Sequence, residues 1–489
     1  MQDCDIDKPL TPQDLAPRIA REVGSRPRLS AVRLLSDGRE AFTARIHSIR
    51  AAKFTIDVQT YIWRDDTTGR FVAHELICAA DRGVQVRVLL DDMDARARDR
   101  ALEALDRHPH ISVRMFNPFH TRSGWLRTIA ELSQRGSRLN HRMHNKSWIV
   151  DGQLAIVGGR NIGDEYFAAA GEVNFIDLDV LLLGPAVGQA VRVFESYWTS
   201  QLSAPIGRLR KLARGRLSPR KLQRDLHRSA QQVAASDYGA SLAAECDADA
   251  LFEGRFIWSA DVQVVADDPR KALHDGSVAS SQVLESMATE ILAASRQVLL
   301  ISPYFVPGIG GTSALRNLAQ QGAEVAVLTN SLAATDVAVV HSGYARYREP
   351  LLQSGVKLFE MKSAPAIEEE RGRMRLGSSR ASLHTKAAVI DGERVFVGSF
   401  NIDPRSAQLN CEMGVWIRSG SLARVLIESF RLGADPHRSL AVSLDAAGQL
   451  QWIEQVDGQA VRYSDEPHSG RLRRLVVRVL ELLPLESQL

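Results

Sequence analysis

The sequence is poor in cysteine, has no long apolar run and has almost no net charge. Its four cysteines lie far apart, without a C-x-x-C pair or a zinc-type spacing: Cys4, Cys78, Cys246 and Cys411. We therefore expect buried thiols in a reducing compartment, and neither disulfides nor a zinc site. No stretch of about 18 apolar residues is present, so we expect no segment to span a bilayer. The first thirty residues also lack the apolar core of a signal peptide.

The charge balance excludes some classes of protein and draws attention to one residue type. The chain of 489 residues carries 61 basic and 58 acidic side chains, a formal charge of +3, which gives no reason to expect a nucleic-acid partner. Hydrophobic residues make up 45% and charged residues 24%, which excludes a disordered or fibrous chain. Lysine is scarce, because only nine of the 61 basic residues are lysine and 52 are arginine. Each lysine therefore needs a local reason.

Two copies of one polar pattern occur in the chain. Residues 144–161 read HNKSWIVDGQLAIVGGRN, and residues 384–401 read HTKAAVIDGERVFVGSFN, aligned without a gap at an offset of 240. The polar residues that they share are His144, Lys146, Asp151 and Asn161 in the first copy and His384, Lys386, Asp391 and Asn401 in the second. An internal repeat of this kind indicates a duplicated domain, so we read the chain as two related halves.

The repeat continues upstream in a looser form. Three pairs of segments align: 54–63 with 298–307, 79–90 with 318–329, and 113–116 with 356–359. In each half, short β-branched strands alternate with stretches of helical period, and a hairpin carrying the polar pattern follows. This alternation predicts an α/β fold made of two tandem α/β/α sandwich domains, each around a largely buried sheet.

The repeat predicts five parts of the chain. They are an N-terminal extension (1–28), a first domain (29–200), a basic linker (201–250), a second domain (251–440) and a C-terminal extension (441–489). Between residues 208 and 228 the linker holds nine arginines or lysines against one acidic residue. Gly215 and Pro219 interrupt it, so we do not expect one continuous helix. Two interpretations stand, a solvated linker and a patch for anionic headgroups or phosphates.

The C-terminal extension contains an amphipathic basic segment, RLRRLVVRVLELL, at residues 471–483. Five of its leucines and valines fall on one helical stripe, with the charged residues mostly opposite: Leu472, Leu475, Val476, Val479 and Leu483. A basic helix with an apolar stripe can lie in the interface of a membrane. The same pattern suits a terminal helix packed against the protein core, and the sequence leaves both interpretations open.

The repeated pattern supplies the groups that phosphodiester chemistry needs. In a strand, residues i and i+2 face the same side, so His144 projects together with Lys146, and the second pair does the same. A neutral imidazole can attack phosphorus to form a phosphohistidine, while a protonated one serves first as acid and then as base. The lysines and asparagines would stabilise charge on the non-bridging oxygens. We therefore expect an enzyme that needs neither a metal nor another cofactor.

The doubled H-x-K-x4-D pattern, each copy followed by GG or GS and Asn, resembles the phospholipase D superfamily. From about Leu29 to the C-terminus, the chain more narrowly resembles bacterial cardiolipin synthases of the C type. The segments that carry this resemblance are NPF (117–119), RMHNKS (142–147), GGRNIGDEYF (158–167), LTNSLAATDVAVVHSGYARYREPLL (328–352) and GSFNIDPRS (398–406). The resemblance implies a single active site at the interface of the two halves.

The resemblance also implies an activity. A phosphatidyl group would pass through a phosphohistidine onto phosphatidylglycerol to make cardiolipin, with phosphatidylethanolamine as a further candidate substrate. By analogy with the superfamily, His144 would be the nucleophile and His384 the acid and base. The protein would associate peripherally with a membrane, the inner membrane of a bacterium, and no nucleic acid is expected as a partner. The sequence identifies no protein partner.

Superfamily members use an acidic residue beyond each motif to orient its histidine, and such a partner fixes the tautomer of the imidazole. Glu412 fits the second copy, and Asp179 is our choice for the first, with Glu172 and Asp177 as alternatives. The two motif aspartates lie at predicted turns, where a structural role and contact with substrate both stay open.

Other features and functions compete with this interpretation. Asp91, Asp92 and Asp94 follow a predicted strand and suggest Mg²⁺, but the equivalent segment of the second half, TNSLA, contains no acid. A phosphodiesterase that uses water would need the same residues, with phospholipid as substrate or, less readily, nucleic acid. The sequence shows no aromatic stacking platform for a nucleic acid. An inactive lipid-binding protein would not need both motifs intact.

Overall fold

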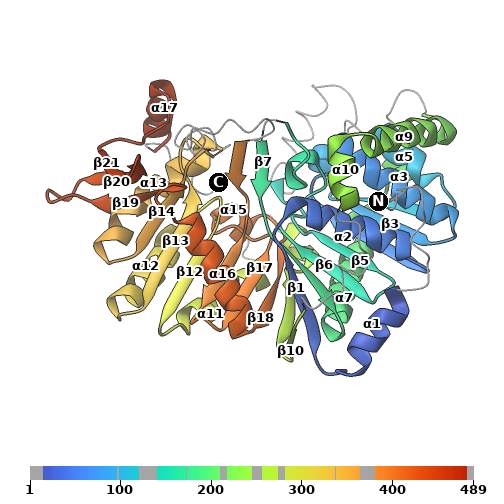
Figure 1. Ribbon diagram of the computed structural model, residues 1–489, viewed down its shortest axis with the longest axis horizontal. Coiled ribbons are helices and arrows are strands. Elements are labelled where there is room, and N and C mark those ends of the chain that lie inside the picture. Colours follow the sequence, from blue (N-terminus) through green and yellow to red (C-terminus); the bar gives the residue numbers. More distant parts are fainter. Residues whose placement is uncertain are drawn as a thin grey trace.

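The computed structural model describes residues 15–95, 99–119, 140–171, 173–209, 217–244, 256–273, 281–335, 337–363 and 380–481. Two large mixed sheets, each with helices beside it, form the two halves of the molecule (Figure 1). The first half runs from blue to green on the right of the view, and the second from yellow to red on the left. The α/β fold expected from the alternating pattern is confirmed.

The first half is built on a sheet whose strands follow the order β10-β1-β8-β6-β5-β2-β3-β4-β9. The strands are β1 (Ser30–Leu35), β2 (Thr55–Thr60), β3 (Gln85–Asp91), β4 (Ile111–Phe116), β5 (Ser147–Val150), β6 (Leu154–Gly158), β8 (Asp179–Leu183), β9 (Ser203–Pro205) and β10 (Ile257–Ser259). β2, β3 and β4 run parallel to one another, and the other neighbours are antiparallel.

The second half repeats this plan with the order β11-β18-β17-β16-β12-β13-β14-β19-β20-β21. The strands are β11 (Val262–Ala266), β12 (Gln297–Ile301), β13 (Glu324–Asn330), β14 (Lys357–Met361), β16 (Ala387–Ile390), β17 (Arg394–Gly398), β18 (Met413–Arg418), β19 (Ser439–Leu444), β20 (Leu450–Val456) and β21 (Gln459–Tyr463). A separate two-stranded sheet pairs β7 (Val173–Ile176) with β15 (Arg380–Leu383) and joins the halves.

Helices accompany both sheets. In the first half they are α1 (Leu15–Gly24), α2 (Gly38–Ala51), α3 (Thr67–Asp81), α4 (Asp92–Ala95), α5 (Asp99–Asp106), α7 (Pro185–Trp198), α8 (Ile206–Leu209), α9 (Pro219–Ala234) and α10 (Asp237–Ala244). In the second half they are α11 (Gln282–Leu292), α12 (Gly308–Gln320), α13 (Ala338–Gln353), α15 (Pro404–Gln408), α16 (Gly420–Gly433) and α17 (Arg471–Glu481).

Three apolar cores arrange these elements in layers. One core packs α2, α3, α5 and α9 against the outer face of the first sheet, and another packs α11, α12 and α13 against the outer face of the second. The third contains side chains of both sheets together with those of α7 and α16. Because this central core is shared, the two halves form one folded unit with two inner faces in contact.

The repeated pattern forms the same hairpin in each half. β5 pairs with β6 and β16 with β17, both antiparallel, and equivalent pairs in the two registers are offset by 240 residues, as Ser147↔Val157 and Ala387↔Val397 show. The turns place Asp151 and Asp391 at φ 51° and 54°, each followed by a glycine with positive φ. Two consecutive residues in this region are typical of a type I′ hairpin turn, which explains the Asp-Gly pair.

The sheets do not follow the predicted domain boundaries. β10 falls within the predicted second domain but pairs with β1 of the first sheet, while β19 to β21 fall largely in the predicted C-terminal extension but continue the second sheet. The predicted linker includes α9, which begins at Pro219 and buries Leu222 and Leu226 against the first half. Its polar face carries exposed basic residues: Arg220, Lys221, Arg224 and Arg228.

The apolar stripe of the C-terminal helix α17 is exposed, whereas packing against the protein core would bury it. The helix packs on the protein through buried Val477 and through arginines, because Arg474 and Arg478 both pair with Asp465. Four apolar side chains instead face solvent, with exposed fractions from 41% to 74%: Leu472, Leu475, Val476 and Val479. Leu483 lies outside the described residues. Within the part of the chain that the structure describes, no helix has the length and apolarity to cross a bilayer.

Candidate active site

The first histidine is held in place by the second half of the chain. The backbone N–H of His144 donates to the carbonyl of Cys411 at 2.8 Å, and the N–H of Cys411 donates to the carbonyl of Arg142 at 2.7 Å. β5 begins only at Ser147, so the histidine and lysine precede the strand that we expected to contain them. Their positions are therefore set by contacts between the halves in addition to strand alternation.

The second histidine has the reciprocal arrangement. β15 runs parallel to β7 of the first half and ends immediately before His384. The N–H groups of His384 and Thr385 both donate to the carbonyl of Ile176, at 2.8 and 3.0 Å. Figure 1 shows β7 at the centre of the molecule, between the two large sheets. The backbone of each motif is thus hydrogen-bonded to a backbone segment of the other half.

Each histidine also takes its acidic partner from the other half. Nδ1 of His144 lies 2.8 Å from Oε2 of Glu412, and Nδ1 of His384 lies 2.6 Å from Oδ2 of Asp177. Both carboxylates are buried, at 0% and 2% exposure. A carboxylate accepts hydrogen bonds, so in each neutral imidazole the proton sits on Nδ1 and the lone pair on Nε2.

This geometry corrects the expected pairing. Glu412 was expected beside the second histidine but contacts the first, and Asp179 contacts neither one. The Asp179 carboxylate lies 2.9 Å from the guanidinium of Arg45 and 3.4 Å from that of Arg160, inside the first half. Asp177, named above as an alternative for the first histidine, contacts the second, and Glu172 lies outside the described residues. Residues two apart in an extended chain face the same side, so spacing alone could not choose between the two aspartates.

The glycines of the motif make room for these carboxylates. A Cβ at Gly158 would lie 2.2 Å from Oδ1 of Asp179, and one at Gly159 would lie 2.2 Å from Oδ1 of Asp177. In the second copy the position of Gly159 is taken by Ser399, whose hydroxyl donates to Glu412. The second residue of GG and of GS therefore accommodates the carboxylate in two ways. Gly159 lets Asp177 approach closely, and Ser399 donates a hydrogen bond to Glu412.

Both motif lysines are buried beside their histidines. Lys146 and Lys386 are 3% and 1% exposed, and the ammonium group of each donates to the carbonyl oxygen of the histidine two residues earlier. Burial lowers the pKa of Lys146 to about 7. In a sequence that otherwise uses arginine, a compact ammonium group suits this position, where a planar guanidinium would need more space.

The environment separates the two histidines chemically. Burial first, and then the positive charges of Lys146 and Lys386, hold the pKa of His144 well below its usual value. Burial and Lys386 also lower the pKa of His384, but the carboxylate of Asp177 opposes them. Charges of both halves act on each ring, so the two motifs share one electrostatic environment. His144 is the histidine held more firmly in the neutral form.

The pKa values of the two carboxyl groups are shifted in opposite directions. Burial raises the pKa of Glu412 above its usual range. Burial acts on Asp177 in the same direction, but the charge and hydrogen bond of His384 outweigh it and lower the pKa of this carboxyl. An anionic Asp177 favours a protonated His384, because an opposite charge within a few ångströms stabilises the cation. The pair at His384 is therefore better suited to carry a proton.

The two asparagines of the motif are held differently. The amide oxygen of Asn161 accepts from the backbone N–H of Ile62 at 3.1 Å, and its nitrogen donates to the hydroxyl of Tyr166 at 2.8 Å. Asn401 is 5% exposed, and its amide oxygen has no hydrogen-bond partner among the described residues. Asn401 is thus the amide with hydrogen-bonding capacity left for a ligand, whereas Asn161 is engaged in positioning Tyr166.

The motif aspartates lie at the far end of the hairpin from the histidines and have structural contacts. Asp151 accepts hydrogen bonds from three consecutive backbone N–H groups, at residues 53 to 55. Asp391 does the same at residues 295 to 297. Burial would raise the pKa of Asp391, but these hydrogen bonds lower it. Of the two roles left open, the contacts favour the structural one, because each carboxylate fixes the chain entering β2 or β12.

Sequence reasoning missed an aromatic wall around the two rings. The ring of Tyr61 meets that of His144 edge-on, with centroids 5.0 Å apart. Tyr166 meets His384 in the same way at 5.3 Å, and Phe175 lies 4.9 Å from it. Tyr61 lies in the aligned segment 54–63, opposite Phe305, so the repeat gave a signal for this residue, whereas Tyr166 lies beyond the aligned block 144–161.

The residue between histidine and lysine also ties the halves together. With its amide oriented by its hydrogen-bond network, Asn145 donates to the carbonyls of Cys411 and Glu412 at 3.0 and 3.2 Å. In the second copy the hydroxyl of Thr385 donates to the carbonyl of Ile176 at 2.9 Å. The variable position of H-x-K thus carries a polar side chain in both copies for the same reason.

Two of the three carboxylates considered for Mg²⁺, Asp91 and Asp92, have protein partners. Asp91 is fully buried and accepts from the N–H groups of Met93 and Met143, both at 2.9 Å. Asp92 accepts from the N–H of Phe119 at 2.7 Å. Burial raises the pKa of Asp91 to about 6, against the opposing charge of Arg142. Asp91 therefore supports the backbone next to His144.

Two H-x-K motifs, exchanged across the junction of two α/β halves, define a protein of the phospholipase D superfamily. The family described as cardiolipin synthase, PLD-like domain, matches residues 46–198 and 287–432. Cardiolipin synthase C of Escherichia coli (strain K12) is 40% identical over 454 residues, 91% of this chain and 93% of that protein. The chain belongs to the cardiolipin synthase family of the phospholipase D superfamily.

A further relative agrees with this membership, and a solved structure has a similar fold. Cardiolipin synthase of Staphylococcus aureus (strain Mu50) is 25% identical over 402 residues, 82% of this chain and 66% of that protein. The crystal structure of phosphatidylserine synthase from Haemophilus influenzae superposes with a TM-score of 0.57 at 13% identity, covering 86% of this chain and 91% of that one. At this identity the superposition supports the fold.

Proposed function

We propose that the protein makes cardiolipin by transferring a phosphatidyl group from one phosphatidylglycerol to a second, with release of glycerol. The chain is an enzyme of the cardiolipin synthase family, a phosphatidyltransferase. The observation that carries the proposal is the pair of histidine–carboxylate contacts, His144 to Glu412 and His384 to Asp177, at the junction of the halves. Two imidazoles held in this way can divide the roles of nucleophile and acid.

The first step forms a covalent intermediate. Nε2 of neutral His144 attacks the phosphorus of the donor lipid, and the bond from phosphorus to the glycerol oxygen breaks. Protonated His384 gives its proton to that oxygen, so glycerol leaves as a neutral alcohol. The asymmetry of the two rings supports this order, because His144 is held neutral and Asp177 favours the cation of His384.

The second step reverses the roles at phosphorus. Neutral His384 takes the proton of the terminal hydroxyl of a second phosphatidylglycerol, whose oxygen attacks the phosphohistidine. The phosphorus–nitrogen bond breaks, cardiolipin is released, and His144 returns to its starting form. Lys146, Lys386 and the side-chain NH₂ group of Asn401, as donors, would stabilise negative charge on the non-bridging oxygens in both steps. With water as the acceptor, the same sequence would yield phosphatidic acid.

We further propose that the protein meets its substrates at a membrane surface through α17. The exposed stripe of Leu472, Leu475, Val476 and Val479 presents apolar area that no described residue covers. Arginines hold the helix on the protein from the other side, with Arg474 and Arg478 on Asp465. Binding at an interface follows from apolar area together with attraction to anionic lipid. In a bacterium we place this surface at the inner membrane.

A product assay tests the activity. Purified protein with phosphatidylglycerol vesicles in the presence of a chelator is expected to yield cardiolipin and an equal amount of glycerol. His144→Ala should abolish turnover, and His384→Ala should lower it by a factor of at least about 10³, because each removes a group that acts in the transition state. Phosphatidic acid as the main product would show a hydrolase instead. Cleavage of single-stranded DNA without lipid turnover would refute the proposal.

The intermediate gives an independent test. With ³²P-labelled phosphatidylglycerol, wild-type protein should carry label on His144 during turnover. The label should be lost in acid and kept in base, as expected of a phosphohistidine. The His384→Ala variant should still accumulate label when given a donor with a better leaving group than glycerol, while His144→Ala should carry none. Label on His384 in place of His144 would reverse the assignment of the two roles.

A further inference from the structure

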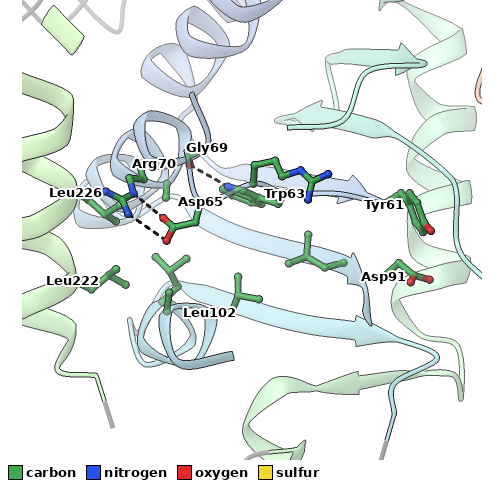
Figure 2. A pocket seen from close by; sticks show the side chains of 14 residues that line it. Tyr61, Trp63, Asp65, Gly69, Arg70, Asp91, Leu102, Leu222 and Leu226 are labelled. Atoms are coloured by element: carbon green, nitrogen blue, oxygen red, sulfur yellow. Dashed lines mark hydrogen bonds and ion pairs between the residues drawn. The ribbon is translucent and has the colours of Figure 1, made fainter. Parts of the chain in front are cut away.

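An apolar cavity lies in the first half, next to the active site (Figure 2). It has a cavity volume of about 60 Å³, is open to solvent, and lies between β3 and the helices α3, α5 and α9. The side chains that matter for its chemistry are Ala73, Ala101, Leu102, Leu105, Leu222 and Leu226. An unfilled apolar space leaves its lining without contacts, which a ligand of matching chemistry would restore.

The inner end of the cavity is lined by two residues that contact the first motif or the residue before it. Tyr61 lines the cavity, and its ring meets the ring of His144 at 5.0 Å and lies 5.5 Å from the ammonium of Lys146. Asp91 lines the same end and holds the backbone of Met143. In Figure 2 the labelled side chains of Tyr61 and Asp91 lie together at one side of the view.

The outer end of the cavity reaches the surface. Asp65 and Arg70 form an ion pair there at 2.7 Å, with side chains 58% and 47% exposed. Figure 2 shows this pair and Leu226 on the side opposite Tyr61. Leu222 and Leu226 are contributed by α9, so the predicted linker forms part of the wall. The cavity therefore extends from Tyr61, which packs against the catalytic histidine, to the surface, with apolar side chains between two polar ends.

We propose that this cavity receives one acyl chain of the phosphatidyl donor while the phosphate lies at His144. The inference rests on the proposed function and adds a binding site to it. Glycerol or a free phosphate would leave polar groups unpaired against the leucine and alanine wall, whereas a hydrocarbon chain removes its methylenes from water there. The ester-linked chains of a phosphatidyl group begin a few bonds from phosphorus, so Tyr61 stands where a chain would leave the active site.

Photolabelling tests occupancy without requiring turnover. Phosphatidylglycerol with a diazirine along one acyl chain, presented in vesicles to the full-length protein, should label residues of α5 and α9, above all Leu102, Leu105, Leu222 and Leu226. Excess unlabelled dioleoyl phosphatidylglycerol should reduce that labelling. Labelling restricted to α17 or to other surfaces would overturn the proposal.

A filling substitution tests the effect on catalysis. Ala101→Phe should lower kcat/KM for dioleoyl phosphatidylglycerol about tenfold and that for dihexanoyl phosphatidylglycerol by less than about threefold, because the short chain has few methylenes to bury. The matched control is Ala234→Phe, which fills a second apolar cavity of the same half that contains no active-site residue. This control should keep both values near wild type.

The outcomes separate the cavity from the activity. An equal loss with both lipids, or no loss with either, would show that the cavity does not hold the chain. Wild-type protein that makes no cardiolipin but is labelled in α5 and α9 would refute the proposed function and leave the acyl site standing. Cardiolipin formation without labelling in α5 and α9 would refute the acyl site and leave the proposed function standing. Thermal unfolding of both variants checks that they fold.

Discussion

Glu412 accepts a hydrogen bond from Nδ1 of His144 across 268 positions of sequence, from one half of the chain to the other. The carboxylate is fully buried and also accepts from the hydroxyl of Ser399. Its neighbour Asp267 in turn accepts from the backbone N–H of Glu412 and pairs with buried Lys271. The nucleophile proposed in one half is thus oriented by a carboxylate of the other half, which is itself held by further hydrogen bonds.

Replacing this carboxylate should impair catalysis more than folding. Glu412→Gln keeps the shape but no longer fixes the proton on Nδ1, so we expect kcat to fall by about 10² to 10⁴. Cardiolipin formation under saturating substrate measures the effect. Asp179→Asn is the matched control, because it leaves Arg45 and Arg160 with a neutral partner in the core. It should cost about 3 kcal/mol of stability and keep turnover per folded molecule near wild type; a loss comparable to that of Glu412→Gln would refute our assignment.

Asp177→Asn should shift the pH dependence of the reaction. The carboxylate of Asp177 raises the pKa of His384 against burial and Lys386, so its removal lowers that pKa further. His384 must be protonated to release glycerol, and this form disappears as the pH rises. We therefore expect the alkaline limb of kcat/KM to move to lower pH in the variant. A limb that stays in place while kcat falls would assign Asp177 a structural role.

The buried histidines should make the protein sensitive to mild acid. The pKa of His144 in the folded protein lies well below 6.5, so the unfolded chain takes up the proton first as the pH falls. The contribution of His144 to the free energy of unfolding is therefore fully present above pH 6.5. Below that pH it should decline by about 1.4 kcal/mol per pH unit, down to the folded-state pKa of this residue. Urea unfolding between pH 7.5 and 5.5 measures the slope. His144→Gln, which still donates to Glu412, should have a shallower slope.

The motif aspartates should matter for stability. Asp151→Ala removes an acceptor for three backbone N–H groups and places alanine at φ 51°. We expect it to cost about 2–4 kcal/mol of unfolding free energy. Asp151→Asn tolerates this φ and should cost less. Turnover per folded molecule should change less than about threefold in both variants, and a drop comparable to that of Glu412→Gln would instead indicate contact with substrate.

The exposed stripe of α17 should control membrane binding. Leu472→Ser with Leu475→Ser removes apolar area that would enter the interface, and we expect at least about tenfold weaker binding to anionic vesicles in co-sedimentation. Leu432→Ser is the control, because this leucine is also about half exposed, at 51%, but lies on α16. Unchanged binding by the double variant, with lower thermal stability, would show that the stripe packs against protein.

The sequence could predict what depends on local pattern and on the repeat. Alternating elements, the hairpins and the eight shared polar residues follow from periodicity and from the constant offset. The partners of the histidines could not follow, because Glu412 and Asp177 are brought to them by the packing of one half on the other. Asp177 follows β7 and Asp179 begins β8. Their spacing does not separate their roles, which depend on the contact of Asp177 with His384 and of Asp179 with Arg45. The scarcity of lysine indicated a local reason for Lys146, whereas its burial and its lowered pKa required the surrounding structure.

The exchange of partners also has a consequence for the origin of the site. When residue i of one unit contacts residue j of the other, and j of the first contacts i of the second, the interface has twofold symmetry. His144 with Glu412 and His384 with Asp177 follow this rule. The two histidines are 240 residues apart and the two acids 235, but Asp177 and Glu412 hold equivalent places, each two residues before the residue that pairs with Gly158 or Gly398. The arrangement is that of a homodimer whose two subunits have become covalently joined. With both copies in one chain, each copy can differ from the other, as glutamate against aspartate at the acidic partner and serine against glycine after Gly398 and Gly158 show.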